Sequence, residues 1–180
     1  AVGWRGGGGG MLATGIGGRV TGRWGVAMAE TAIGYFPDLG SLFLVSRAPG
    51  EIGTHLAMTG VAVGGADAVT AGLADALVDS HDIPGLVARL AAGELLYADV
   101  GSASTVGSLE ADRDSIDSCS AGNDPIEIRR ALRAAPAPAP PRFADVLQPR
   151  SPRAVSVALV AVRRPPRRPP PAEVPAPALN

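Results

Sequence analysis

Two carboxylates, Glu30 and Asp38, stand eight residues apart in a segment that opens with five glycines at residues 6–10. A carboxylate held beside a reacting group can act as a general base or as a nucleophile. Glycine has no Cβ, so a glycine run lets a ligand approach the backbone N–H groups closely. N–H groups fixed in a loop can stabilise the oxyanion that develops when a carbonyl is attacked. By composition alone, the same residues also fit a flexible linker followed by an ordinary strand and turn.

The order of the residues in this segment is more informative than their composition. Residues 6–11 read GGGGGM, residues 27–47 read AMAETAIGYFPDLGSLFLVSR, and residues 48–60 read APGEIGTHLAMTG. This order resembles the crotonase (enoyl-CoA hydratase/isomerase) superfamily, and within it the 3-hydroxyisobutyryl-CoA hydrolase branch. Two positions depart from that branch: Ala29 stands where it usually has Pro, and Ser41 where it usually has Gly. The resemblance implies an α/β fold class, with a partial crotonase-like (ClpP/crotonase) spiral core followed by a helical C-terminal region.

The resemblance also implies roles for individual residues. Glu30 is expected to be the reactive carboxylate, either as a general base on water or as a nucleophile on a thioester carbonyl, and the sequence leaves both open. Asp38 is expected to assist Glu30, and it could also cap the helix that follows. The glycine run, Gly7 and Gly8 in particular, is expected to supply the oxyanion and substrate-binding element, with the amide of Gly7 as a donor.

Two positions separate hydrolysis from hydration within the superfamily. Hydratases carry a second catalytic Glu where this chain has Gly10, and they commonly have Gly where this chain has Asp38. We therefore expect hydrolysis of a short 3-hydroxyacyl-CoA thioester, 3-hydroxyisobutyryl-CoA, as in valine catabolism. Two alternatives stay open. One is an enoyl-CoA hydratase/isomerase-like protein, and the other is a catalytically inactive, truncated crotonase-like protein that binds acyl-CoA or a partner.

The expected ligand is the acyl-CoA substrate, and no metal or redox cofactor is expected because CoA is part of that substrate. His55, His81 and the single Cys119 are scattered without metal-ligand spacing, and we expect His55 on a helix surface. The longest apolar run, residues 154–162, is far shorter than the ~20 residues of a membrane span. We expect a cytoplasmic protein, with a homo-oligomer as an option and neither nucleic acid nor membrane as a partner.

Charge is distributed unevenly along the 180 residues. Residues 1–124 hold six arginines and fourteen acids, a net of −8, whereas residues 125–180 hold ten arginines and three acids, a net of +7. The second part also holds 14 of the 17 prolines, so we expect some of it to be extended and solvated. An arginine-rich segment can attract phosphate groups.

The pattern predicts a crotonase-like core over 1–100 that lacks its N-terminal part, a loop over 101–123, helices over 124–164 and a Pro/Arg-rich disordered tail over 165–180. Finer expectations are listed here: helices at 11–16, 39–47, 51–59, 67–71, 83–90, 124–135 and 151–164; strands at 19–21, 26–28 and 76–78; and an extended spacer at 135–141.

We further expect this chain to be incomplete as an enzyme. In the superfamily a second oxyanion amide comes from a loop earlier in the chain, and only five residues precede Gly6. On that reasoning, the chain made alone would be poorly soluble or oligomeric and nearly inactive.

Overall fold

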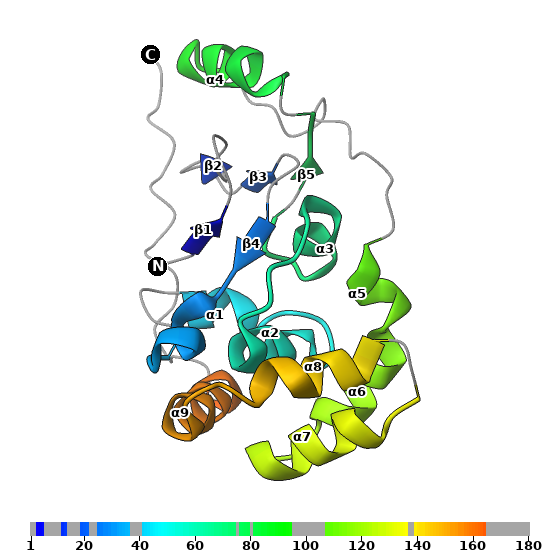
Figure 1. The fold of residues 1–180 in the computed structure, drawn as a ribbon. Helices are drawn as coiled ribbons and strands as arrows, with labels where there is room; N and C mark the ends of the chain where they lie inside the picture. Colours follow the sequence, from blue (N-terminus) through cyan, green and yellow to red (C-terminus); the bar gives the residue numbers. More distant parts are fainter. Residues whose placement is uncertain are drawn as a thin grey trace.

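The protein combines a region of short strands with a larger group of helices (Figure 1). The computed structural model describes residues 3–5, 12–13, 19–21, 25–36, 41–74, 76–79, 81–94, 107–136 and 139–164. The strands are β1 (Gly3–Arg5), β2 (Leu12–Ala13), β3 (Arg19–Thr21), β4 (Gly25–Ala27) and β5 (Ala76–Leu77). A 3₁₀ helix, η1 (Ala29–Ile33), follows β4 directly. The α-helices are α1 (Ser41–Val45), α2 (Ile52–Thr59), α3 (Gly65–Thr70), α4 (Ile83–Ala91), α5 (Ser108–Ala111), α6 (Arg113–Ser120), α7 (Pro125–Ala134), α8 (Ala139–Leu147) and α9 (Pro152–Arg163).

The described strands form two small sheets. β1 pairs antiparallel with β4, and Trp4 lies opposite Val26. β3 lies between β2, to which it is antiparallel, and β5, to which it is parallel. On its other edge β4 is held by Val63, because Val26 and Val63 exchange two backbone hydrogen bonds of 2.8 Å. The last residues of β4 are therefore fixed from both sides.

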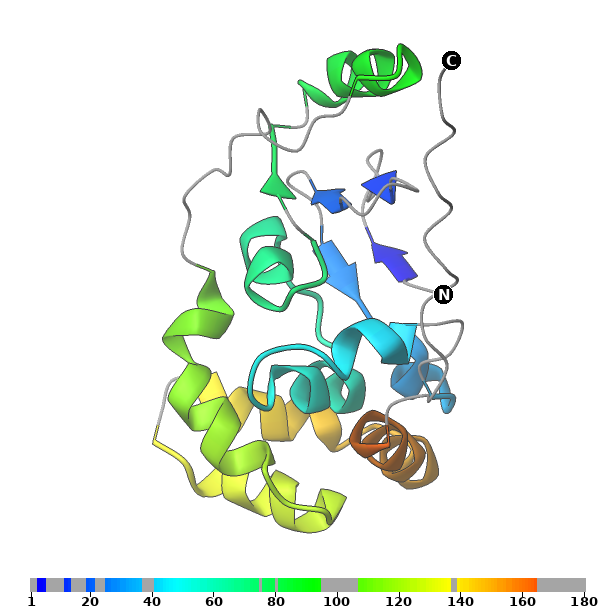
Figure 2. The same cartoon turned by 180° about the vertical axis from the view of Figure 1, so that it is seen from behind.

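Helix α2 lies at the centre of the helical group (Figure 2). Each of its residues, from Ile52 to Thr59, is buried. It packs against η1, α1, α6, α8 and α9. Gly60 ends it in the left-handed conformation, with a φ of 61°, and donates its N–H to the Leu56 carbonyl. The sequence prediction of a helix that begins after Glu51 and ends at Gly60 is confirmed.

Close contact between α1 and α2 depends on Gly53. A Cβ on this residue would overlap the carbonyl oxygen of Val45, the last residue of α1. The two helices can therefore approach this closely only because position 53 has no side chain.

The C-terminal helices begin where their capping residues predict. Asp124 accepts a 2.8 Å hydrogen bond from the Ile126 N–H at the start of α7, and Ser151 accepts one of 3.4 Å from the Ala154 N–H at the start of α9. Helix α9 buries one apolar face, listed here: Ala154, Val155, Ala158, Leu159 and Val162. In the part of the chain that is described, no helix has both the length and the apolar character needed to cross a membrane.

Three expectations about local structure are wrong. Residues 12–13 form strand β2 instead of part of a helix, because pairing with β3 outweighs the weak helical preference of so short a segment. The described part of the expected loop over 101–123 contains α5 and α6, whose Leu109 and Ile116 are buried. The expected spacer ends early, because α8 begins at Ala139 and places Pro140 and Pro141 in its first turn, where a missing N–H costs little.

A single side chain explains where α5 begins. The carboxylate of Asp67, in α3, accepts hydrogen bonds from the Leu109 N–H at 2.8 Å and from the Ser108 hydroxyl at 3.0 Å. This cap comes from a residue more than forty positions earlier in the chain, so the local sequence around residue 108 does not contain it. The predicted division into domains is not tested by these elements and stays a prediction.

The α1–α2 contact yields a stability prediction. Gly53→Ala should lower the free energy of unfolding by about 1–3 kcal/mol, because the added methyl group forces the two helices apart. Thermal or denaturant unfolding of the purified chain measures the difference. Gly85→Ala in α4 is the matched control, since a Cβ there meets nothing within 4 Å and should be neutral or slightly stabilising. Equal stability of the two variants would contradict the role given to Gly53.

Candidate functional site

Glu30 is the second residue of η1, and only Met28 separates η1 from β4. Glu30 and its neighbours in the chain are buried: Met28 is 2% exposed, Glu30 9% and Thr31 0%. A glutamate is seldom buried to this degree without a specific role or partner. Because β4 is bonded on both edges and η1 packs against α2 and α9, the position of this carboxylate is fixed by the surrounding fold.

The backbone turns sharply just after Glu30. Gly34 adopts a φ of 80°, a left-handed conformation that favours glycine, and directs its N–H towards the carbonyl oxygens of Glu30 and Thr31. The Tyr35 N–H donates a 2.9 Å hydrogen bond to the same Glu30 carbonyl. The backbone of Glu30 is therefore held in place by these hydrogen bonds.

An apolar surface follows this turn, and the sequence analysis assigned it no role. Ile33 is 82% exposed and Tyr35 49% exposed, and the Tyr35 ring stacks on Phe36 with 4.8 Å between ring centroids. Large apolar side chains that are exposed together mark surfaces that bind other molecules. The signal was present in the sequence as the letters IGYF at residues 33–36, shortly after Glu30.

The other predicted site residues cannot be placed. Gly7, Gly8 and Asp38 lie outside the described residues, as does Gly10. Their roles stay predictions, and of the predicted site only Glu30 has a described environment.

His55 is buried, and the expectation that it lies on a helix surface is wrong. It is 1% exposed, and its ring meets Phe143 edge-on, with centroids 4.2 Å apart and an angle of 73°. Neither ring nitrogen has a hydrogen-bond partner within the described part of the chain. The sequence held one signal of burial: residues 52–60 contain no charged residue, so no face of α2 is marked as solvent-exposed.

Burial lowers the pKa of His55 from 6.5 to about 4, and the positive charge of Arg142 adds to this effect. Arg142 lies over the Phe143 ring and forms a 3.6 Å ion pair with Asp112. The unfolded chain therefore takes up a proton on this histidine more readily than the folded protein does. The stabilisation that neutral His55 permits is complete above pH 6.5 and is lost as the pH falls towards 4.

We therefore expect His55→Leu to remove part of the acid sensitivity of folding. In the wild-type chain the free energy of unfolding should fall by at most about 3 kcal/mol between pH 6.5 and 4 through this group. Thermal unfolding across that pH range measures the slope for both proteins. The chain has two histidines, so His81→Leu, which removes an exposed histidine, is the control against which the slope of His55→Leu is compared. Identical slopes for wild type and His55→Leu would refute the assignment.

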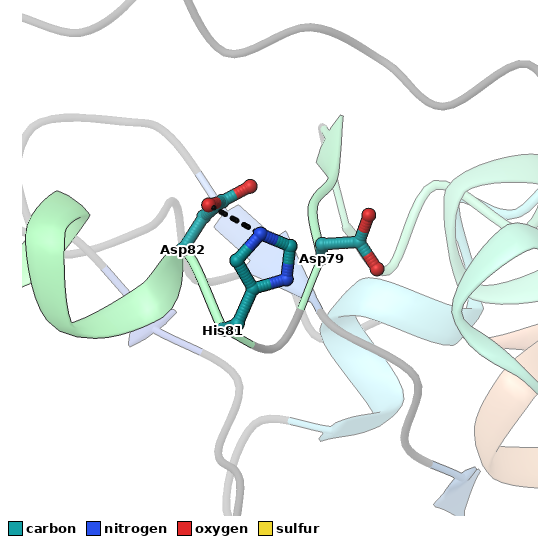
Figure 3. A group of neighbouring side chains, drawn as sticks. All are labelled: Asp79, His81 and Asp82. Carbon is teal, nitrogen blue, oxygen red and sulfur yellow. Dashed lines mark ion pairs between the residues drawn. The ribbon is translucent and has the colours of Figure 1, made fainter.

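A group of metal-ligand side chains lies on the exposed loop between β5 and α4 (Figure 3). Ligand atoms of Asp79, His81 and Asp82 all lie within 4.8 Å of one another, and His81 Nε2 is 3.0 Å from an Asp82 oxygen. All three are exposed, and nothing besides their proximity points to an ion. Groups of this kind are common on protein surfaces, so we assign no metal centre here.

Comparison with known proteins places the chain in a family. A family model described as "Enoyl-CoA hydratase/isomerase" matches residues 4–172, nearly the whole sequence. A solved structure of a carnitinyl-CoA dehydratase from Mycobacterium thermoresistibile superposes with a TM-score of 0.76 at 39% identity, over 82% of this chain and 44% of that one. The chain belongs to the enoyl-CoA hydratase/isomerase family and has part of the crotonase fold, as its sequence indicated.

Two curated relatives are named for different functions, one as an enzyme and one as a ribosomal protein. Mitochondrial 3-hydroxyisobutyryl-CoA hydrolase from Xenopus tropicalis is 47% identical over 66 residues, which is 37% of this chain and 17% of the relative. Small ribosomal subunit protein mS47 from Schizosaccharomyces pombe is 36% identical over 118 residues, which is 59% of this chain and 28% of the relative. The chain therefore spans well under half the length of each of these proteins.

Proposed function

We propose that this chain carries the reactive carboxylate of a hydrolase for a short 3-hydroxyacyl-CoA thioester, with 3-hydroxyisobutyryl-CoA as the first candidate. The observation that supports this most directly is the environment of Glu30, a buried acid in η1, the 3₁₀ helix that follows β4. The acid stands in the stretch AMAETAIGYFPDLG, and the frog hydrolase is a close relative over 66 residues.

In the proposed reaction, an oxygen nucleophile adds to the thioester carbonyl carbon and the carbon–sulfur bond then breaks. Glu30 either takes a proton from the attacking water, or attacks the carbonyl itself to form an anhydride that water opens in a second step. In both versions the acyl group leaves as a carboxylic acid and the sulfur leaves as the CoA thiol. The reaction requires no metal and no redox cofactor.

The residues outside the described part complete the proposal. The Gly7 amide donates to the oxyanion, Gly8 keeps the backbone open to the thioester, and Asp38 helps to place the attacking group. Gly10 offers no side chain where hydratases use a second Glu, and this favours hydrolysis over the double-bond chemistry named for the dehydratase relative. The exposed apolar surface of Ile33 and Tyr35 suits the acyl part of such a substrate.

The second candidate is a non-catalytic component of a ribosomal subunit. The match to mS47 covers 59% of this chain, whereas the match to the hydrolase covers 37%. A relative of this chain is thus named as a component of a ribosomal subunit, and this supports a partner-binding role as the alternative. The hydrolase relative is named as mitochondrial, which supports a mitochondrial location in place of the expected cytoplasmic one.

Glu30→Gln tests the proposed chemistry. We expect it to lower thioesterase turnover at least ~10²-fold, because a positioned proton-transfer group contributes about that much. The measurement is release of the CoA thiol from 3-hydroxyisobutyryl-CoA, followed with a thiol reagent. Glu94→Gln is the control, since Glu94 lies on the exposed surface at the end of α4 and pairs with Arg89. Unchanged turnover in the Glu30 variant would refute the role of this residue.

Asp38→Asn tests the second acid. We expect kcat to fall more than KM rises, because the proposed task of Asp38 lies in the chemical step. Steady-state kinetics on the same substrate separates the two parameters. If KM rises while kcat stays at its wild-type value, or if the variant fails to fold, Asp38 is a helix cap rather than a participant in the reaction.

Parallel assays distinguish the two candidate functions from each other and from the hydratase alternative. Hydrolysis releases a thiol, whereas hydration of an enoyl-CoA removes the absorbance of its conjugated double bond without releasing thiol. A protein that does neither, but sediments with small ribosomal subunits, fits the non-catalytic candidate.

A further inference from the structure

Helices α7 and α8 pack against each other (Figures 1 and 2). A groove of about 330 Å³ lies beside them. Its lining is listed here: Ile126, Arg129, Arg130 and Arg133 from α7, and Gln148 just after α8. No residue of η1 lines this groove, so it is distinct from the surroundings of Glu30.

The helical spacing places these four side chains of α7 on one face. Positions 126, 129, 130 and 133 follow the i, i+3, i+4, i+7 pattern of a single helix surface. The opposite face carries Ile128 and Leu132, which are 2% and 1% exposed. Packing of the apolar face therefore determines that the three arginines point away from the core and into the groove.

One of the three arginines has a structural partner. Arg133 donates hydrogen bonds to an Asp145 oxygen at 2.7 Å and to the Gln148 side-chain oxygen at 3.2 Å, and so links α7 to α8. Because the carbonyl oxygen of Gln148 accepts from Arg133, its NH₂ group is left as a donor beside the groove.

The other two arginines have no such partner. Arg133, Arg142 and Arg163 each pair with an acid, but Arg129 and Arg130 pair with none of the described residues. Both are exposed on a groove wall. Guanidinium groups present a planar set of donors that matches the oxygens of a phosphate group in a two-point contact. Two such guanidiniums lining one groove can contact two linked phosphate groups.

We propose that the α7–α8 groove binds a compact organic diphosphate of the nucleoside diphosphate type. Arg129 and Arg130 bind the phosphate groups, the Gln148 amide donates to them, and the 60% exposed Ile126 contacts the organic part. The volume is at the lower end for a small-molecule site. Glu127, exposed on α7, and Asp145, paired with Arg133, place negative charge on the same two helices, and this favours a compact ligand over a long nucleic-acid strand.

The proposal is tested by titrating the full chain with ADP in a calorimeter at low ionic strength. We expect saturable binding, weaker binding of AMP and none of adenosine. Arg129→Gln/Arg130→Gln should weaken ADP binding at least ~10-fold, since each charged hydrogen bond lost accounts for roughly that factor. Arg153→Gln, which changes an exposed arginine in the first turn of α9, should bind ADP like the wild-type chain.

Two further arms make the outcome decisive. Glu30→Gln should bind ADP normally, because the groove does not include the proposed hydrolase site, and this separates failure of one proposal from failure of the other. Single-stranded poly(U) should bind no more tightly than ADP. The proposal is overturned if ADP does not bind, if the double variant binds as well as Arg153→Gln, or if poly(U) binds far more tightly and shows the groove to be part of a nucleic-acid track.

Discussion

The complete burial of helix α2 is the constraint on which the other helices depend. A helix with all eight residues buried, among them two threonines and a histidine, cannot present any side to water. Every direction around it must therefore be covered, and α1, α6, α8, α9 and η1 provide that cover. One of its buried polar side chains forms a hydrogen bond within the helix: the Thr59 hydroxyl donates to the His55 carbonyl at 2.7 Å. The His55 ring receives no such compensation, so α8 can cover α2 fully only while the ring is neutral.

The same requirement explains the charged contacts at the start of α2. Glu51, just before the helix, binds Arg163 at the end of α9 at 2.7 Å, and its N–H donates to an Asp117 oxygen of α6 at 2.6 Å. Arg163 also donates to the carbonyls of Ser120 and Gly122. One arginine thus joins the start of α2, the end of α6 and the end of α9. Since η1 packs against α2 and α9, these contacts also bear on where Glu30 is held.

Sequence reasoning succeeded wherever the determinants of an element are local. Asp124 and Ser151 begin their helices, Gly60 ends α2, and the buried face of α9 follows from its spacing. The motif around Glu30 indicated both the family and the residue whose buried position the structure describes. Sequence reasoning failed where the contact that determines an element or a burial lies outside the local sequence. Strand β2 exists because of β3, α5 is capped by Asp67, and His55 is buried because α8 lies over it. Asp67 and α8 lie more than forty positions from the residues they affect, and the short segment at 12–13 carries no strand pattern of its own.

The ion pair between Glu51 and Arg163 joins residues that are 112 positions apart, and this distance has a consequence during synthesis. At roughly 5–20 residues per second, on the order of ten seconds separate the appearance of the two ends of that pair at the ribosome. Until α8 and then α9 have been made, the apolar side chains of α2 lack their cover and are open to chaperones or to other nascent chains. Within the described residues, the core around α2 is therefore complete only once α9 has been made.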